Sequence, residues 1–132
     1  MVSWKRKQAK EQLNIKEKNG VVWLSFPALE ESGLVSHSFS TRIGGVSKGV
    51  FSSMNFSFTR GDEPEHVMEN YHRMAEILGT APEKMVLSYQ THTTHVRKVT
   101  EEDEGKGIVR PRDYQDVDGL ITNVPGITLV TF

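Results

Sequence analysis

Only one stretch of this chain has the residue spacing of an amphipathic helix, and this limits the folds that the sequence can adopt. The stretch runs over residues 64–78, and apolar side chains recur in it at helical intervals. These side chains are Val67, Tyr71, Met74 and Leu78. Pro64 suits a first helical turn, and Gly79 suits the left-handed conformation that commonly ends a helix. The sequence therefore predicts one principal helix over residues 64–78.

The other apolar residues lie in short runs that are typical of strands. Residues 13–26 alternate apolar and polar side chains around Asn19-Gly20, a dipeptide that favours a hairpin with a type I′ turn. Further strands are predicted over residues 34–41, 50–58, 85–89, 96–99, 118–122 and 126–132. Strands combined with a single helix predict a mixed α/β (α+β) domain, with a mixed β-sheet, an N-terminal hairpin and one principal helix. We expect one domain over residues 1–132, in which residues 1–11 form a flexible basic arm.

The composition is that of an ordinary globular domain and excludes several classes of function. A chain of 132 residues is long enough to bury roughly two-thirds of its unfolded surface. Its net charge of −1 lacks the basic excess of a nucleic-acid-binding protein. No apolar run approaches the ~20 residues that a membrane span needs, and a polar stretch follows the basic N-terminus. The sequence therefore predicts a cytoplasmic protein that binds neither nucleic acid nor membranes.

The run "QTHTTHV", residues 90–96, contains two histidines three positions apart. The intervening Thr93 and Thr94 are β-branched and favour an extended chain, as do the apolar residues on both flanks. Alternate residues of a strand point to opposite faces, so His92 and His95 would diverge and could not chelate one ion together. The chain contains no cysteine, which excludes disulfides, thiolate nucleophiles and zinc–thiolate sites within these residues.

Four ordered segments carry a resemblance to a known family. They are "HSFSTRIGGVSKGVFSSMNFSF", "GDEPEHVMENYHRM", "QTHTTHV" and "DGLITNVPGITLVTF". Together they resemble the laccase-domain family, the YfiH- or YlmD-like proteins that have been described both as multicopper polyphenol oxidases and as zinc-containing purine nucleoside phosphorylases. The resemblance runs from about Ser36 to Phe132, so the chain looks like the N-terminal half of a YfiH-like domain, truncated before its end.

The resemblance implies a set of site residues. The histidine of the family's "QxH" motif is a metal ligand and matches His92, while the family's other two ligands, a cysteine and a second histidine, follow the segment matched by residues 126–132. The metal is expected to be zinc, with copper as the alternative. His92 and Arg42 are the implied catalytic residues. The implied substrate-binding residues are Gly44, Gly45, Asn55 and Gln90.

The chemistry of these residue types leaves two roles open. Arg42 and the backbone N–H groups of Gly44 and Gly45 could hold a phosphate, because glycine lets the backbone approach an anion closely. Alternatively, Arg42 forms a salt bridge with a carboxylate and the glycines only make the turn. Gln90 could reach a substrate or bond to the backbone, and the sequence does not choose between them.

The family resemblance implies the phosphorolysis of purine nucleosides, a transferase reaction, or the deamination of adenosine, a hydrolase reaction. The expected partners are a purine nucleoside and phosphate. Because one imidazole is only a third of a zinc site's usual protein ligands, we expect the chain as given to be inactive alone. The alternatives are copper-dependent phenol oxidation and a non-catalytic fragment that acts by association. Residues 126–132 have high β-propensity, no charge and no proline, which predicts self-association through this C-terminal strand.

Overall fold

The computed structural model describes residues 13–132, so the predicted basic arm over residues 1–11 lies outside the described residues. The chain divides into two compact units, Met1–Val67 and Met68–Phe132, each of which is described by itself. Across the described part of the chain, no helix combines the length and the apolar character needed to cross a bilayer.

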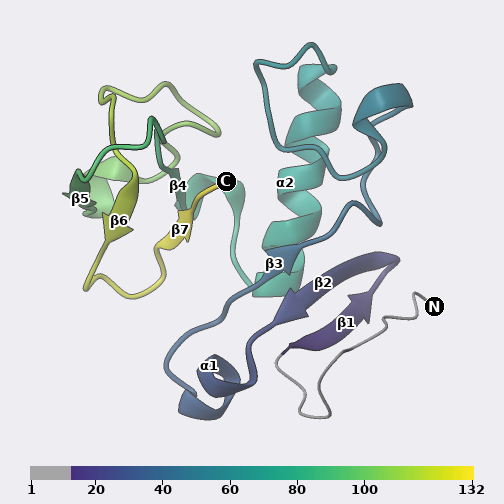
Figure 1. The fold of residues 1–132 in the computed structure, drawn as a ribbon, viewed down its shortest axis with the longest axis horizontal. Coiled ribbons are helices and arrows are strands. Elements are labelled where there is room, and N and C mark those ends of the chain that lie inside the picture. Colours follow the sequence, from purple (N-terminus) through teal and green to yellow (C-terminus); the bar gives the residue numbers. More distant parts are fainter. Residues whose placement is uncertain (1–12) are drawn as a thin grey trace. The chain divides into compact units, whose positions relative to one another are not determined.

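The first unit is built on a three-stranded antiparallel sheet with the order β1-β2-β3 (Figure 1). The strands are β1 (Asn14–Lys18), β2 (Val21–Ser25) and β3 (Phe39–Ser40). β1 and β2 form the predicted hairpin, in which φ is 52° at Asn19 and 78° at Gly20. Positive φ at both central residues is the signature of a type I′ turn, so this prediction is confirmed.

Several predicted strands of the first unit are shorter than expected or absent. Only two residues of the predicted strand 34–41 are extended and paired, as β3, and the predicted strand 50–58 does not form. A short helix that the sequence did not predict, α1 (Pro27–Ser32), follows the hairpin, and the 3₁₀ turn η1 (Gly49–Phe51) lies further along. Proline fixes φ at the start of α1, and Gly33 ends it with φ 63°. A helix of six residues is too short to show the apolar periodicity that, together with Pro64 and Gly79, predicted the helix over residues 64–78.

Helix α2 (Pro64–Leu78) has the predicted bounds, and Gly79 follows it with φ 72°. Its buried residues are Val67, Asn70, Tyr71, Met74 and Ala75. Three of the four predicted stripe residues are therefore buried, whereas Leu78 is half-buried. Asn70, which is not part of the predicted stripe, is also fully buried; it has a polar partner, as a buried amide requires.

The second unit holds two small parallel strand pairs after the 3₁₀ turn η2 (Pro82–Lys84). β4 (Met85–Leu87) pairs with β7 (Thr128–Val130), and β5 (Val96–Lys98) pairs with β6 (Gly119–Ile121) (Figure 1). The apolar core residues on and near these strands are Met85, Val86, Leu87, Val99, Ile108 and Val117. The mixed α/β class is thus confirmed, although the strands of residues 13–132 form three small sheets rather than one.

A buried carboxylate organises the charged segment between β5 and β6. Asp103 ends the 3₁₀ turn η3 (Glu101–Asp103) and is 2% exposed. Its Oδ1 accepts hydrogen bonds from Arg97 Nη2 and Lys106 Nζ, both at 2.8 Å, and Lys106 Nζ also donates to Asp113 at 3.0 Å. Burial opposes the ionisation of Asp103, but the bonds from Arg97 and Lys106 outweigh it and lower its pKa to about 2.

Candidate functional site

Residues 90–95 form a loop, here called the histidine loop, between Tyr89 and β5. Tyr89 is held to Val117 by an isolated antiparallel bridge, and regular pairing stops there until β5 begins. His92 has φ 64°, a left-handed conformation that non-glycine residues rarely adopt. The prediction that the two histidines lie on a strand and diverge by strand alternation is therefore wrong. The threonines favour extended chain locally, but contacts with a distant segment decide the loop's conformation.

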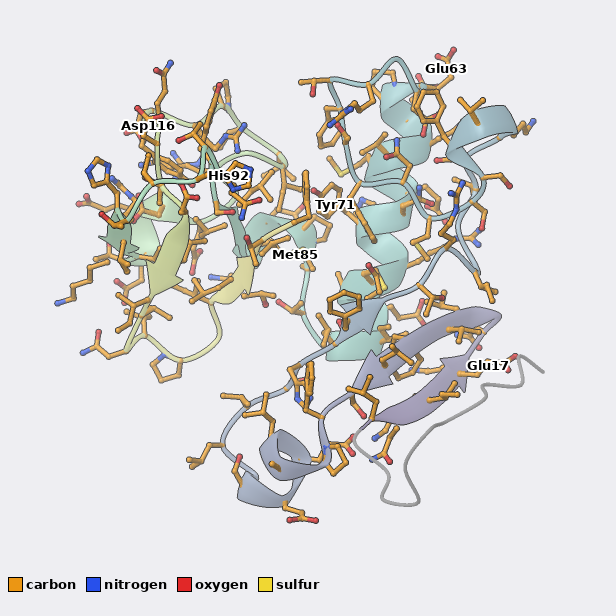
Figure 2. All side chains as sticks on the ribbon, viewed as in Figure 1. Glu17, Glu63, Tyr71, Met85, His92 and Asp116 are labelled. Carbon is orange, nitrogen blue, oxygen red and sulfur yellow. The ribbon has the colours of Figure 1, made fainter. Side chains whose placement is uncertain are left out.

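Those contacts come from two aspartates that precede β6. Thr91 N donates to Asp118 Oδ1 at 3.0 Å, and the Thr91 hydroxyl donates to Asp116 Oδ1 at 2.7 Å. The Thr93 hydroxyl lies 3.0 Å from Asp118 Oδ1 and 3.2 Å from the Asp116 carbonyl oxygen. The threonines thus attach the loop to a segment about 25 residues further along the chain. Figure 2 shows His92 and Asp116 on neighbouring loops of the second unit.

The two histidines have different surroundings. His95 Nδ1 lies 3.1 Å from the Asp116 carbonyl oxygen, and the His95 carbonyl accepts hydrogen bonds from the N–H groups of Asp118 and Gly119. The His92 residue is exposed, and its imidazole has no hydrogen-bond partner among residues 13–132. Both ring nitrogens of His92 are therefore open to a ligand. His95 keeps only Nε2 open, with Nδ1 directed at a carbonyl in the manner common for metal-bound histidines.

Asp118 is ionised under ordinary conditions. Its pKa is lowered first by the hydrogen bond from the Thr91 backbone, against the opposing effect of desolvation. Hydrogen bonds from the Thr93 backbone and hydroxyl and from the His92 backbone lower the pKa further. The carboxylate therefore carries a full negative charge, which strengthens each of these hydrogen bonds to the histidine loop.

The second candidate region is the glycine-rich loop, residues 41–55, in the first unit. Arg42 Nε donates to the Ser52 carbonyl at 3.0 Å, and Nη2 donates to the carbonyls of Ser52 and Val50 at 2.8 and 3.2 Å. Among residues 13–132, Arg42 therefore forms no pair with a carboxylate, the alternative that the sequence left open, and it does not stand wholly free for an anion. Its Nη1 group has no hydrogen-bond partner among residues 13–132, and the residue is exposed.

The two glycines of this loop are required by close packing of the backbone. A Cβ on Gly44 would lie 2.4 Å from the Gly20 carbonyl oxygen, and one on Gly45 would lie 2.0 Å from the Ser53 carbonyl oxygen. Gly45 N already donates to Ser53 Oγ at 3.2 Å. The Gly45 N–H is therefore occupied by the chain itself and is not open to a phosphate.

Asn55 and Gln90 differ in whether the side-chain amide is already hydrogen-bonded within the chain. Asn55 Nδ2 donates to Asp62 Oδ2 at 2.9 Å and to the Ser57 carbonyl at 3.3 Å, while its Oδ1 accepts from Ser57 N at 3.1 Å. These bonds fix the chain before α2 and leave neither amide donor free. Gln90 is exposed and has no side-chain hydrogen bond within the described residues, so of these two residues it is the one placed to meet a ligand.

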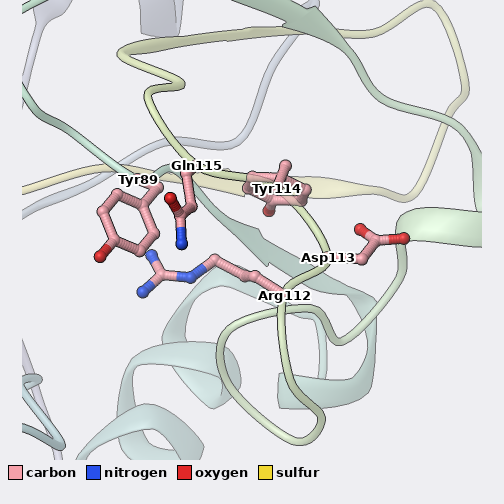
Figure 3. A pocket seen from close by; sticks show the side chains of 5 residues that line it. All are labelled: Tyr89, Arg112, Asp113, Tyr114 and Gln115. Carbon is pink, nitrogen blue, oxygen red and sulfur yellow. The ribbon is translucent and has the colours of Figure 1, made fainter.

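An open groove of about 480 Å³ lies beside the start of the histidine loop (Figure 3). The residues that line it are Tyr89, Arg112, Asp113, Tyr114 and Gln115. The Arg112 guanidinium lies over the Tyr89 ring at 4.4 Å and donates through Nη1 to the Ser88 carbonyl. The volume of the groove is within the range of small-molecule sites. The sequence analysis assigned none of these residues to a site, because Tyr89 and residues 112–115 meet only through tertiary contacts such as those of Arg112 with Tyr89 and Ser88.

No metal site is complete in this part of the chain. Among residues 13–132, no group of three or more His, Cys, Asp or Glu side chains is placed to hold a metal ion. His92 can supply one imidazole ligand, whereas a catalytic zinc needs about three protein ligands. The structure thus brings His92 and Gln90 together on one loop, and it places Arg42, Gly44, Gly45 and Asn55 on segments of the other unit.

Comparison with known proteins decides the family. Residues 36–132 match the family model described as multi-copper polyphenol oxidoreductase laccase. The chain belongs to this laccase family. The family resemblance inferred from the four sequence segments is thereby confirmed.

Curated relatives of this laccase-family chain carry the name of another activity. It is 36% identical over 111 residues to the purine nucleoside phosphorylase YlmD of Geobacillus stearothermophilus, covering 81% of this chain and 39% of the relative. It is 38% identical over 87 residues to the purine nucleoside phosphorylase YfiH of Escherichia coli, covering 66% of this chain and 32% of the relative. The chain thus spans less than half the length of each relative.

Solved structures agree with this assignment. The crystal structure of YlmD from Geobacillus stearothermophilus matches with a TM-score of 0.76 and 33% identity, over 92% of this chain and 44% of the other. The crystal structure of the Bacillus licheniformis hypothetical protein YfiH matches with a TM-score of 0.75 and 29% identity, over 89% of this chain and 43% of the other. The predicted YfiH-like fold is therefore confirmed for this part of the domain.

Proposed function

We propose that this chain supplies the His92-bearing part of a zinc-dependent purine nucleoside phosphorylase. The observation that carries the proposal is the exposed imidazole of His92, which has both ring nitrogens open on a loop fixed by hydrogen bonds from outside it. The match to the laccase family includes this residue, and relatives at 36–38% identity are named purine nucleoside phosphorylases. The substrates are then a purine nucleoside and inorganic phosphate, and the reaction is a group transfer.

The residues of this chain contribute parts of that reaction. When bound, a zinc ion acts as a Lewis acid that orients and polarises the substrate. His92 supplies one of its ligands, and Gln90 lies two residues away with its amide free to hydrogen-bond the nucleoside. Phosphate attacks the anomeric carbon of the ribose, and the purine leaves with the bonding electron pair. The open Nη1 group of Arg42 is the donor we assign to phosphate, in place of the occupied Gly45 N–H.

At least part of the metal's ligand set has to come from outside the residues described here, since these hold no group of three potential ligands. A single imidazole binds zinc too weakly to fill a site, so the 132-residue chain alone is proposed to be inactive. Copper-dependent phenol oxidation, the activity in the family description, is the alternative. Multielectron oxidation normally needs several copper ions, and the chain has only five histidines. We also propose that the protein works in the cytoplasm, where purine nucleosides and phosphate are both present.

The test uses a longer protein in which this sequence continues into the C-terminal part of Geobacillus stearothermophilus YlmD. We expect phosphate-dependent release of free purine from adenosine or inosine, loss of activity with a chelator, and zinc rather than copper by elemental analysis. The 132-residue chain is the matched control and should release no purine with or without zinc. Purine release by that shorter chain, or copper with phenol oxidation in the longer one, would overturn the proposal.

The edge of β7 supports a separate proposal about association. β7 pairs with β4 on one side, and no strand among the described residues covers its other side. Leu129 is 38% exposed and Phe132 is 64% exposed. An uncovered apolar strand edge invites pairing with another chain, so we propose that the 132-residue chain self-associates. Light scattering at high micromolar concentration should show dimers or larger species, and a monodisperse monomer would refute this.

A further inference from the structure

The hydrogen bonds of Asp118 converge on one turn of backbone. Thr91 N and the Thr93 hydroxyl both donate to Asp118 Oδ1 at 3.0 Å. One carboxylate oxygen therefore binds the residues on both sides of His92.

The conformation of His92 is what allows this convergence. His92 is left-handed, with φ 64°, so that Thr91 and Thr93 on either side of it reach the same carboxylate oxygen. For a side chain with a Cβ this conformation is unfavourable, and the hydrogen bonds to Asp118 offset that cost. The other contacts of the loop with this segment join Asp116 to Thr91, Thr93 and His95, and none of them involves His92 itself.

We infer that Asp118 is a positioning residue for His92: by binding Thr91 and Thr93 it holds His92 left-handed and so sets the direction of the imidazole. The left-handed conformation fixes the Cα–Cβ direction of His92 relative to Asp118, the residue directly before β6. The part of this inference that concerns a metal rests on the proposed function, in which His92 is a zinc ligand. The part that concerns the loop does not.

Asp116 provides a matched control for Asp118. Both are aspartates on the same segment and both contact the histidine loop. The Asp116 carboxylate, however, accepts only the hydroxyl of Thr91, while its other contacts with the loop use its backbone carbonyl. Replacement by asparagine removes one charge and keeps one side-chain oxygen at either position. Asparagine also tolerates the positive φ of 53° at position 116. Only Asp118→Asn should release His92.

The first experiment uses the 132-residue chain and no metal. Backbone NMR shifts of His92 should show the left-handed signature in the wild type and in Asp116→Asn. In Asp118→Asn that signature should be lost, with amide exchange at Thr91 to Thr93 faster by about tenfold, the effect of one lost charged hydrogen bond. If Asp118→Asn keeps the signature and only lowers stability, Asp118 is merely structural and the inference is wrong.

A second measurement covers the case in which Asp118→Asn does not fold. Scalar couplings across hydrogen bonds, between the amide nitrogens of residues 91–93 and the Asp118 carboxyl carbon, can be recorded in the wild-type chain alone. A coupling from Thr91 would support the inference. Its absence, with couplings to other acceptors present in the same spectra, would overturn it.

The metal part is tested in the longer protein that continues into the YlmD sequence. Loss of a partner that orients a ligand typically weakens metal binding by about 10–100-fold. Asp118→Asn should weaken zinc binding by that factor, and Asp116→Asn should leave it almost unchanged. If His92→Ala retains zinc, the proposed function fails while the NMR result for the loop still stands. If His92→Ala loses zinc and Asp118→Asn does not, the inference itself fails.

Discussion

The glycine-rich loop and the histidine loop both carry residues that resemble a family site, yet they are held in opposite ways. In the glycine-rich loop, Arg42 and Gly45 direct their hydrogen bonds at neighbouring parts of the same loop. In the histidine loop, the stabilising groups are carboxylates from a distant segment, and the side chains of Gln90 and His92 remain open. In the glycine-rich loop, polar groups of Arg42 and Gly45 are hydrogen-bonded within the loop itself. In the histidine loop, hydrogen bonds from a distant segment fix the conformation, and the side chains of Gln90 and His92 remain available to a ligand.

This difference shows that a residue of a family motif can be required for packing or can be available for binding and catalysis. Gly44 stands where the backbone touches the hairpin at Gly20 and Val21, and Gly45 where it touches Ser53 of the same loop, so the sequence needs glycine at both positions for packing. His92 stands where packing requires no imidazole, since the residue is exposed. A residue that the fold does not need is the stronger candidate for chemistry.

The largest expected effect comes from filling the contact at Gly45. A Cβ there would lie 2.0 Å from the Ser53 carbonyl oxygen, and backbone cannot move aside as a side chain can. Gly45→Ala should cost about 3 kcal/mol or more of stability, measured by urea unfolding. Gly49→Ala is the control in the same loop, because nothing lies within 4 Å of its Cβ position and only its φ of 58° is strained, at about 1 kcal/mol. Equal costs for both variants would show that the loop is not held by this contact.

The next effect concerns the charges that hold the segment between β5 and β6. The Asp103 carboxyl has a folded pKa of about 2 against its usual value of 3.8. The unfolded chain therefore takes up a proton first as the pH falls, and Asp103 stabilises the folded state fully above about pH 4. That contribution, about 2 kcal/mol, should be lost between pH 4 and 2.

Urea unfolding across this pH range measures the effect. Asp103→Asn should remove most of the pH dependence, whereas Asp113→Asn, at the exposed end of the Lys106 pair, should leave it in place. The same slope in wild type and Asp103→Asn would mean that other carboxyls account for the acid sensitivity of this segment.

A smaller effect distinguishes shape from charge at Arg42. Lysine keeps the positive charge but cannot reproduce the fork that meets the carbonyls of Val50 and Ser52. Arg42→Lys should therefore lower stability by about 1 kcal/mol, measured by urea unfolding. In the longer protein it should raise the KM for phosphate only modestly, because the charge is kept. Unchanged stability with a large rise in that KM would mean that Arg42 acts chiefly on phosphate.

The features that the sequence predicted correctly are encoded locally. The type I′ turn follows from Asn19-Gly20, and helix α2 follows from the apolar residues between Val67 and Leu78, which recur at helical spacing. The histidine loop was predicted wrongly because Thr93 and Thr94 favour extended chain, while Asp118, 27 residues after Thr91, imposes a left-handed turn. No periodicity within residues 90–96 carries that information.

The candidate site could be predicted from the sequence only in part. The position of His92 came from the order of four family segments, and the family was then confirmed. The roles of Asp116, Asp118 and the groove beside Tyr89 depend on which loops meet, and this is a property of the tertiary structure. The hydrogen bonds from Arg42 to the carbonyls of Val50 and Ser52 also depend on tertiary structure. Nothing in "TRIGG" predicts these partners.

The most direct test of this account is the zinc content of two variants of the longer protein that continues into the YlmD sequence. His92 has both ring nitrogens open, whereas His95 has Nδ1 against the Asp116 carbonyl and retains only Nε2 as an alternative ligand atom. We expect His92→Ala to lose most of the zinc and the phosphorolysis. His95→Ala should keep about one zinc per chain and most of the activity. If His95→Ala lost the metal and His92→Ala kept it, the assignment of the ligand to His92 would be contradicted.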